Sequence, residues 1–190
     1  IFCFGFGQVA KNFIKKLIIE KYNITLTTTS RSKSSKNNFE GIIYNSYLFN
    51  SKRFDNNLVG ELKEADHILI SIPPEKQEDL VVKNFSEFIG ESKVKWITYL
   101  SATSVYGNHN GEWVSEDSET RPTSLNGTAR LKAENSWLSL QMSKNLSIQI
   151  FRLSGIYSNE KNILVRLKMG TAKLINKNEH YFSRIHVEDI

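Results

Sequence analysis

The sequence predicts an α/β fold built on a doubly wound parallel sheet, and three observations support this. A short apolar run at the start ends in a glycine-rich turn that leads into an amphipathic helical pattern. Along the chain, β-branched or apolar runs alternate with segments of helical spacing, which implies right-handed crossovers between parallel strands. Residues 66–72 form an apolar run that stops at Pro73-Pro74, as a buried parallel strand would at the ligand edge of a sheet.

The opening turn predicts a phosphate site. It reads G-x-G-x-x-A from Gly5 to Ala10. Gly5 allows a sharp turn, Gly7 lets the backbone approach a pyrophosphate, and Ala10 lets the helix lie close to the strand. The free N–H groups and the positive end of the helix would face the phosphates. The alternative is a tight turn that binds nothing. The predicted contacts are Gly5, Phe6, Gly7, Gln8 and Val9.

The second predicted strand, residues 24–29, indicates which dinucleotide is bound. It is rich in β-branched residues and ends at Ser30, Arg31, Ser32 and Lys33. An acid here would hydrogen-bond the ribose 2′-hydroxyl of NAD, whereas hydroxyls and cations suit the 2′-phosphate of NADP. We therefore expect NADP to be preferred over NAD. The alternative is that this is simply a basic, serine-rich loop.

The remaining elements follow in order. Further strands are predicted at 42–44, 66–72, 94–100 and 148–153, the last reading Ile148 to Leu153. Helices are predicted at 54–65, 75–89, 124–142 and 162–169, from apolar residues at helical spacing. Residues 108–123 are polar and predict a long loop, which in a compact domain is more often functional than filler.

Composition limits the classes of partner. The net charge is +5, but the lysines are scattered, so we expect a solvated surface and regard a nucleic-acid contact as a weak third alternative. No run is long enough to span a membrane, and no metal-ligand spacing occurs. Cys3 is the single cysteine, which is consistent with a reducing compartment and a cytoplasmic location.

The chain lacks an initiator Met and stops at Ile190, so we expect a fragment that lacks part of its C-terminal region.

Several blocks together resemble the extended short-chain dehydrogenase/reductase superfamily, of the nucleotide-sugar epimerase/dehydratase type. Besides the glycine-rich turn, four segments are similar to family motifs. They are S-A-T-S-V-Y-G at 101–107, P-T-S-L-N-G-T-A-R-L-K-A-E at 122–134, F-R-L-S-G-I-Y at 151–157 and R-I-H-V-E-D at 184–189. The resemblance implies a Rossmann fold, with an NAD(P)-binding domain at 1–153 and a partial substrate-binding region at 154–190.

The departures from the family pattern concern its catalytic Ser/Thr, Tyr and Lys. Aligned by the motifs, the Tyr position is Asn126, the Lys position is Arg130, and the Ser/Thr position is Ala102. Asn has no titratable proton near neutral pH, and Arg, with a pKa above ~12, cannot give one up, although it can still hold ribose hydroxyls. The chain thus looks like an atypical branch of the superfamily with a changed active site.

Two functional hypotheses follow from the resemblance. The first is an epimerase, dehydratase or reductase that acts on a small-molecule substrate, a nucleotide-sugar or another carbonyl compound, with its acid relocated to Tyr106, His109 or His186. The alternative role for Tyr106 is that of a packing aromatic side chain that helps to form the wall of the pocket. The second is a non-catalytic NAD(P)-binding module that regulates a partner. Members of the family often form dimers through helices of the kind that carries Asn126, so a homodimer is a further prediction. Further cofactor contacts implied by the motifs are Ser71, Ile72, Pro73, Ser101, Arg130, Ser154 and Ile156.

Overall fold

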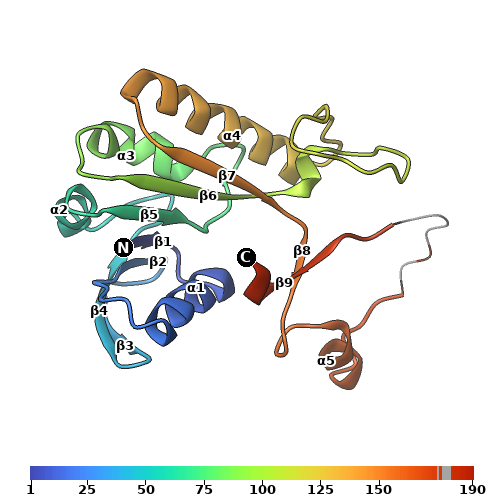
Figure 1. Cartoon of the computed structure of the whole chain (residues 1–190), viewed down its shortest axis with the longest axis horizontal. Coiled ribbons are helices and arrows are strands. Elements are labelled where there is room, and N and C mark those ends of the chain that lie inside the picture. The colour runs from blue at the N-terminus through green and yellow to red at the C-terminus, as the bar shows by residue number, and fades with distance from the viewer. Residues whose placement is uncertain (175, 177–180) are drawn as a thin grey trace.

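The computed structural model describes residues 1–174, 176 and 181–190. Its centre is a seven-stranded sheet with the order β3-β4-β2-β1-β5-β6-β7 (Figure 1). The strands are β1 (Phe2–Phe4), β2 (Thr27–Ser30), β3 (Ser35–Phe39), β4 (Ile42–Leu48), β5 (His67–Ile70), β6 (Trp96–Ala102) and β7 (Ile148–Leu153). The helices are α1 (Gln8–Ile19), α2 (Asn57–Lys63), α3 (Leu80–Gly90), α4 (Leu125–Lys144) and α5 (Ile163–Lys168).

The strand order confirms the predicted doubly wound sheet. Six strands run parallel, and only β3 is antiparallel, to its neighbour β4. β1 lies between β2 and β5, where Phe2 is paired with Thr27 on one side and Ile68 on the other. The chain leaves β1 toward β2 and later returns on the other side to β5, so the strand order reverses beside β1. In open α/β sheets, ligands bind at such a reversal point, outside the carboxyl ends of the strands.

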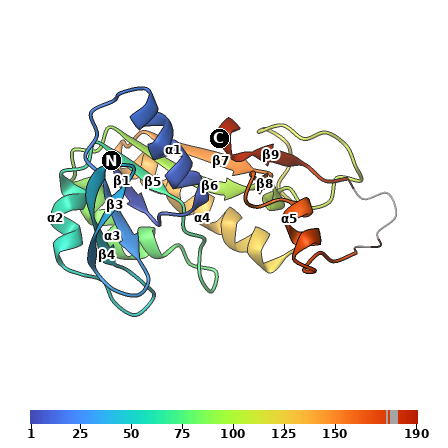
Figure 2. The ribbon, with the colours of Figure 1, turned by 90° about the horizontal axis from the view of Figure 1, so that it is seen from below.

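The core has two layers, one on each face of the sheet. On one face, α2, α3 and α4 pack over Phe2 and Phe4, with Trp137 of α4 fully buried. On the other face, α1 packs over Cys3 through Ala10 and Ile14 (Figures 1 and 2). Neighbouring residues of β1 therefore point into different layers, which explains why this short strand is apolar at every position.

Some predicted boundaries were wrong, and one strand of the seven-stranded sheet was not predicted. β2 begins at Thr27 rather than residue 24, and α3 begins at Leu80 rather than 75. The carboxylate of Asp79 accepts hydrogen bonds from the Val81 and Val82 N–H groups and caps α3, while 75–78 form a turn. β3 was missed. It forms a hairpin with β4 where regular alternation would put a helix.

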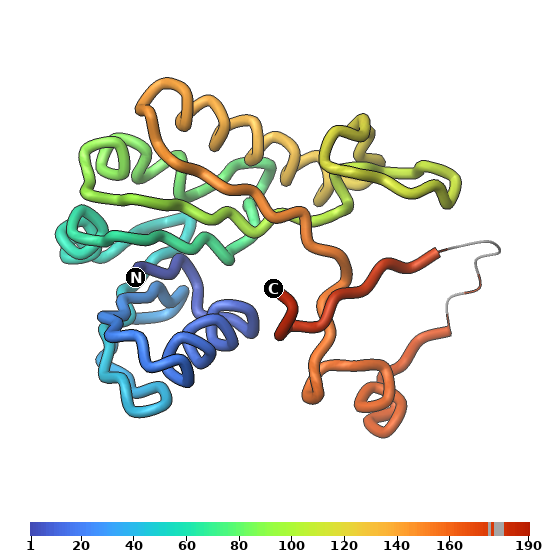
Figure 3. Tube along the Cα trace, viewed as in Figure 1, coloured from blue at the N-terminus to red at the C-terminus, as the bar shows by residue number. Residues whose placement is uncertain are grey.

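The last part of the chain forms a separate small sheet. Strand β8 (Gly155–Tyr157) pairs with β9 (Arg184–His186), and α5 lies on the connection between them (Figures 1 and 3). A short 3₁₀ helix, Val187–Asp189, follows and contacts α1, where the Asn12 amide donates to the Val187 carbonyl at 3.0 Å. The sheet boundary falls at the predicted division between 153 and 154, although the division into two domains stays a prediction. No helix among the described residues is long and apolar enough to span a membrane.

Candidate functional site

The predicted cofactor residues gather at one edge of the sheet. Because the six parallel strands share one direction, the segments that follow them emerge together. Figure 1 shows these carboxyl ends directed toward the side that carries β8 and the 108–123 loop. The segments are 5–9 after β1, 30–32 after β2, 71–73 after β5, 101–106 at the end of β6, and 154–156 after β7.

The neighbouring strands hold the glycine-rich turn in place. Gly5 has φ +84°, and a Cβ here would lie 2.7 Å from Ile72 Cγ2 and 2.9 Å from Ser71 Oγ. Its N–H donates to Thr29 Oγ1 at 2.8 Å. The Ser71 hydroxyl lies 3.1 and 3.2 Å from the Phe4 and Gly5 carbonyl oxygens. Only glycine fits this position, and Ser71 and Ile72 help to shape the turn.

Gly7 differs from Gly5, because a Cβ on Gly7 would meet no heavy atom within 4 Å. Gly7 is the residue before the first turn of α1, and the first helical hydrogen bond runs from the Lys11 N–H to the Gly7 carbonyl. The N–H groups of Gln8, Val9 and Ala10 therefore have no acceptor within the helix. The first turn carries no acid. Open space, free amides and the helix dipole are what a pyrophosphate requires.

A cavity of about 580 Å³ adjoins this turn. Gly7, Gln8, Lys11, Lys161 and His186 are among the residues that line it. The Gln8 Nε2 atom is buried and has no hydrogen-bond partner among the described residues. A buried donor without a partner is costly, and a bound anion or hydroxyl group would satisfy it. The residues present thus fit a phosphorylated dinucleotide.

The loop after β2 presents hydroxyls and a cation. The Ser30 and Ser32 hydroxyl oxygens lie 3.2 Å apart, and the Ser32 N–H points to Ser30 Oγ at 3.4 Å. The Arg31 side chain is exposed, and in the described part of the chain it makes no ion pair. The loop for which the sequence predicts contact with a 2′-phosphate therefore has an exposed cation and two hydroxyls.

The three positions that the motifs align with the family's catalytic residues lie at the end of β6 and in the first turns of α4. Asn126 is exposed, and its side chain makes no hydrogen bond to any described residue. Arg130 Nη1 donates to the Leu100 carbonyl of β6 at 2.7 Å. Ala102 ends β6 and offers no polar side-chain atom. No titratable side chain therefore stands at the three catalytic positions, apart from the permanently charged guanidinium.

A buried polar network that the sequence did not predict lies behind these positions. Glu134 of α4 is 1% exposed and accepts from Arg152 of β7 through Nε and Nη2, at 2.9 to 3.3 Å. It also accepts from the Ser101 hydroxyl. Hydrogen bonding to Glu134 raises the pKa of Arg152, so the guanidinium stays charged. The predicted cofactor contact Ser101 thus has its hydroxyl proton directed toward Glu134.

Tyr106 belongs to the same network. It is 6% exposed, its hydroxyl accepts from Arg152 Nη1 at 3.1 Å, and the guanidinium lies 4.9 Å from its ring centroid. This geometry favours packing over the relocated acid. His109 faces the Glu119 carbonyl in the loop, and His186 caps the turn at Glu188. Glu134 and Arg152 both lie within recognised motif blocks, and this was the one signal that could have indicated their pairing.

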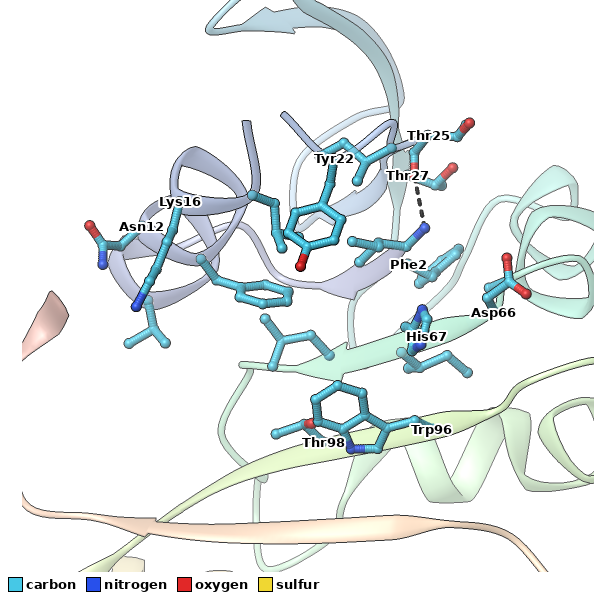
Figure 4. A pocket seen from close by; sticks show the side chains of 18 of the residues that line it. Phe2, Asn12, Lys16, Tyr22, Thr25, Thr27, Asp66, His67, Trp96 and Thr98 are labelled. Atoms are coloured by element: carbon cyan, nitrogen blue, oxygen red, sulfur yellow. Dashed lines mark hydrogen bonds between the residues drawn. The ribbon is translucent and has the colours of Figure 1, made fainter. Parts of the chain in front are cut away.

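A second cavity, of about 860 Å³, lies elsewhere (Figure 4). Asn12 and Lys16 of α1, His67 of β5, and Trp96 and Thr98 of β6 are among its lining residues. Its lining reaches the amino-terminal ends of β1, β5 and β6, and of the predicted cofactor contacts only Val9 takes part. The smaller cavity is lined by three of the predicted contacts, Phe6, Gly7 and Gln8. The described residues contain no group of three or more His, Cys, Asp or Glu that could hold a metal ion.

Solved structures resemble the chain along its whole length, whereas no family model and no curated protein matches it. A functionally unknown conserved protein from Silicibacter pomeroyi DSS is 30% identical, with a TM-score of 0.79. That match covers 99% of this chain but 64% of the other, so the chain spans less than two thirds of its relative.

Two sugar-nucleotide epimerases are similar in fold. UDP-N-acetylglucosamine 4-epimerase from Methanobrevibacter ruminantium M1, in complex with UDP-N-acetylmuramic acid, is 15% identical with a TM-score of 0.76, covering 99% of this chain and 68% of that one. UDP-glucuronic acid 4-epimerase from Bacillus cereus, in complex with UDP-glucuronic acid and NAD, is 14% identical with a TM-score of 0.77, covering 99% and 69%. The chain has the fold of the NAD-dependent epimerases and dehydratases, which confirms the resemblance at the level of architecture.

Proposed function

We propose that this chain is an NAD(P)-binding member of the extended short-chain dehydrogenase/reductase family, of the epimerase/dehydratase type. The observation that carries the proposal is the open space over Gly7, next to three helical amides without acceptors. The Bacillus cereus epimerase, which has the same fold, binds NAD.

The proposed cofactor is NADP rather than NAD. Arg31 carries the positive charge and the paired hydroxyls of Ser30 and Ser32 supply hydrogen-bond donors, as a 2′-phosphate requires. The three residues of this loop include no carboxylate that would select a ribose hydroxyl instead. Arg31→Asp should therefore move the preference from NADPH toward NADH, because it replaces attraction for the 2′-phosphate with repulsion.

The proposed substrate is a sugar-nucleotide or a related carbonyl compound, handled by a non-standard site. Both epimerases compared above bind UDP-sugars. Bound NADP would supply hydride chemistry, while Arg130 would hold ribose hydroxyls with the part of its guanidinium that does not contact Leu100. Asn126 could only orient a substrate group, since it has no proton to exchange.

The alternative is a binding module that binds NADP but catalyses no reaction with it. It is favoured by the lack of an exchangeable proton at Asn126, Arg130 and Ala102 beside an intact phosphate-binding turn. The burial of Tyr106 in contact with Arg152 supports it further, because that phenol is not free to serve a substrate. Cofactor occupancy would then act through a partner surface. A homodimer and a cytoplasmic location stay predictions in either case.

One experiment tests both functions. The purified chain is titrated with NADPH and with NADH, followed by nucleotide fluorescence, and is then offered sugar-nucleotides and simple carbonyls. Steady oxidation of NADPH by a carbonyl, or conversion of a sugar-nucleotide by the chain loaded with oxidised cofactor, supports the enzyme, because an epimerase regenerates its cofactor and consumes none. Tight binding with neither reaction supports the module. Binding of neither nucleotide refutes the proposal. If Arg31→Asp leaves the affinity ratio unchanged, the NADP preference is wrong.

A further inference from the structure

Asn50, in the turn after β4, ties that turn to the loop after β2. Its side-chain Nδ2 donates to the Arg31 carbonyl at 3.0 Å. Its Oδ1 accepts from the Lys52 N–H at 3.0 Å and from the Arg53 N–H at 3.1 Å. One side chain therefore closes its own turn and reaches across 19 residues to the backbone of Arg31, the residue that carries the cation of the proposed 2′-phosphate site.

The turn that carries Asn50 is anchored in the core. Phe49 is 3% exposed, and Phe54 packs against the same cluster of apolar side chains. The two residues form an isolated antiparallel bridge around the turn. The Phe49 N–H donates to the Ser30 carbonyl at 2.8 Å. Ser30 and Arg31 are thus both fixed to a rigid support through their backbone carbonyls, although their side chains remain available.

We propose that Asn50 is a positioning residue for cofactor specificity, which holds the Arg31 backbone so that the guanidinium meets the 2′-phosphate of NADP. The proposal rests on the NADP preference advanced above. Fixing the backbone limits the region that a long, flexible side chain samples, which lowers the entropy lost when it binds a phosphate. NADH lacks this phosphate, so its binding does not depend on Arg31 being held.

The same contacts limit which groups can bind the phosphate. The Lys52 and Arg53 amides already donate to Asn50, so they are not free to receive an anion. The donors that remain are side chains: the Arg31 guanidinium, the Ser30 and Ser32 hydroxyls, and the exposed cations of Lys33, Lys52 and Arg53. Among the cations, Arg31 is the one whose backbone carbonyl accepts from the Asn50 side chain. Loss of the Asn50 contact should therefore weaken NADPH binding through its effect on Arg31.

The test measures dissociation constants of NADPH and NADH for five variants of the chain, among them Arg31→Ala alone and Arg31→Ala combined with Asn50→Ser. Asn50→Ser keeps an oxygen that can accept from the turn amides but cannot reach the Arg31 carbonyl. Asn50→Ala removes every contact. Asn38→Ala is the matched control, because Asn38 Oδ1 accepts from the Gly41 N–H in the β3–β4 turn and makes no contact with Arg31. Arg31→Ala is combined with Asn50→Ser to form a double-mutant cycle.

We expect Asn50→Ser to weaken NADPH binding about fivefold, the value of one ordinary hydrogen bond, with NADH binding unchanged. Asn38→Ala should leave both constants unchanged. In the Arg31→Ala background, Asn50→Ser should add little, because its effect passes through the missing guanidinium. The thermal midpoint of each variant identifies any that fails to fold.

Equal losses for the two nucleotides, or additive losses in the cycle, would overturn the role of Asn50 while leaving the NADP preference intact. If the unaltered chain binds NADH as well as NADPH, the preference is wrong and the role of Asn50 falls with it. If the unaltered chain binds neither nucleotide, the proposed function itself is wrong. The three failures are thus distinguishable.

Discussion

Replacing Arg152 by Met should destabilise the fold severely, because it leaves the charge of Glu134 buried without its main partner. Arg152 makes three hydrogen bonds to this carboxylate, which is 1% exposed. After the substitution only the Ser101 hydroxyl still donates to it. The Met side chain fills much of the same volume, so packing alone would change little.

The expected cost is about 3–5 kcal/mol in the free energy of unfolding, the range for removing one partner of a buried ion pair. Since a typical domain is stable by about 5–15 kcal/mol, the variant would be marginal. The Tyr106 hydroxyl and the Glu116 carbonyl also lose their contact with Arg152 Nη1, so the 108–123 loop should loosen as well.

Urea unfolding followed by tryptophan fluorescence measures this cost. Trp137 is fully buried on α4, three residues after Glu134, and so lies close to the change. Far-ultraviolet circular dichroism gives a second probe, which tests whether the transition is two-state. The surface control is Lys144→Met, which breaks an ion pair with Glu87 whose carboxylate is largely exposed, so its expected cost is small.

The double variant Glu134→Met with Arg152→Met distinguishes an unpaired charge from lost packing. Two apolar side chains at these positions leave no charge buried, so the double variant should be more stable than Arg152→Met alone. The reasoning is refuted if Arg152→Met costs no more than the Lys144 control. It is also refuted if the two substitutions together cost the sum of the single costs.

Three further predictions concern other positions. Gly7→Val should abolish nucleotide binding while the thermal midpoint changes little, because its Cβ enters open space where the pyrophosphate would lie. Unchanged nucleotide affinity would refute the role of Gly7 in pyrophosphate binding. Gly107→Ala should cost more than about 2 kcal/mol, because φ is +73° and its Cβ would lie 1.8 Å from the Arg121 carbonyl oxygen; Gly41→Ala, with φ +86° but open space, should cost about 1 kcal/mol. Burial raises the pKa of Asp79, so the contribution of this carboxyl to stability falls as pH rises above about 4. Over that range, the free energy of unfolding of Asp79→Asn, measured in urea, should increase relative to that of the wild type. A stability difference independent of pH would contradict this last prediction.

Local pattern predicted most of the elements, and pairing between distant segments accounts for what it missed. β7 was predicted at 148–153 and has these bounds, since its alternating β-branched residues leave little ambiguity. β3 reads S-K-N-N-F, a composition depleted in strand formers. It is a strand because it pairs with β4 over five positions, with Phe39 packed against Phe6 of the glycine-rich turn. No window of the sequence contains that information.

In the candidate site, too, local features could be predicted from the sequence and contacts between distant segments could not. The glycine-rich turn could be predicted, because Gly5 meets a local requirement of the backbone, its positive φ. The pairing of Glu134 with Arg152 could not be predicted from spacing, because these residues come from a helix and a strand whose separation only the folded sheet defines. The same holds for Asn50, whose contact with Arg31 depends on the pairing of β2 with β4.

The contact of Arg130 with β6 bears on the choice between enzyme and binding module. A cation at the family's Lys position would normally suggest that proton transfer survives. Here Arg130 donates to the Leu100 carbonyl and so ties α4 to the adjacent strand, which is a structural reason for a cation at this place whatever the chemistry. Since a guanidinium has five N–H donors, it can serve this carbonyl and a ribose hydroxyl together. The charge at Arg130 is therefore accounted for by its contact with Leu100 and compatible with a bound ribose, whereas evidence for catalysis has to come from turnover.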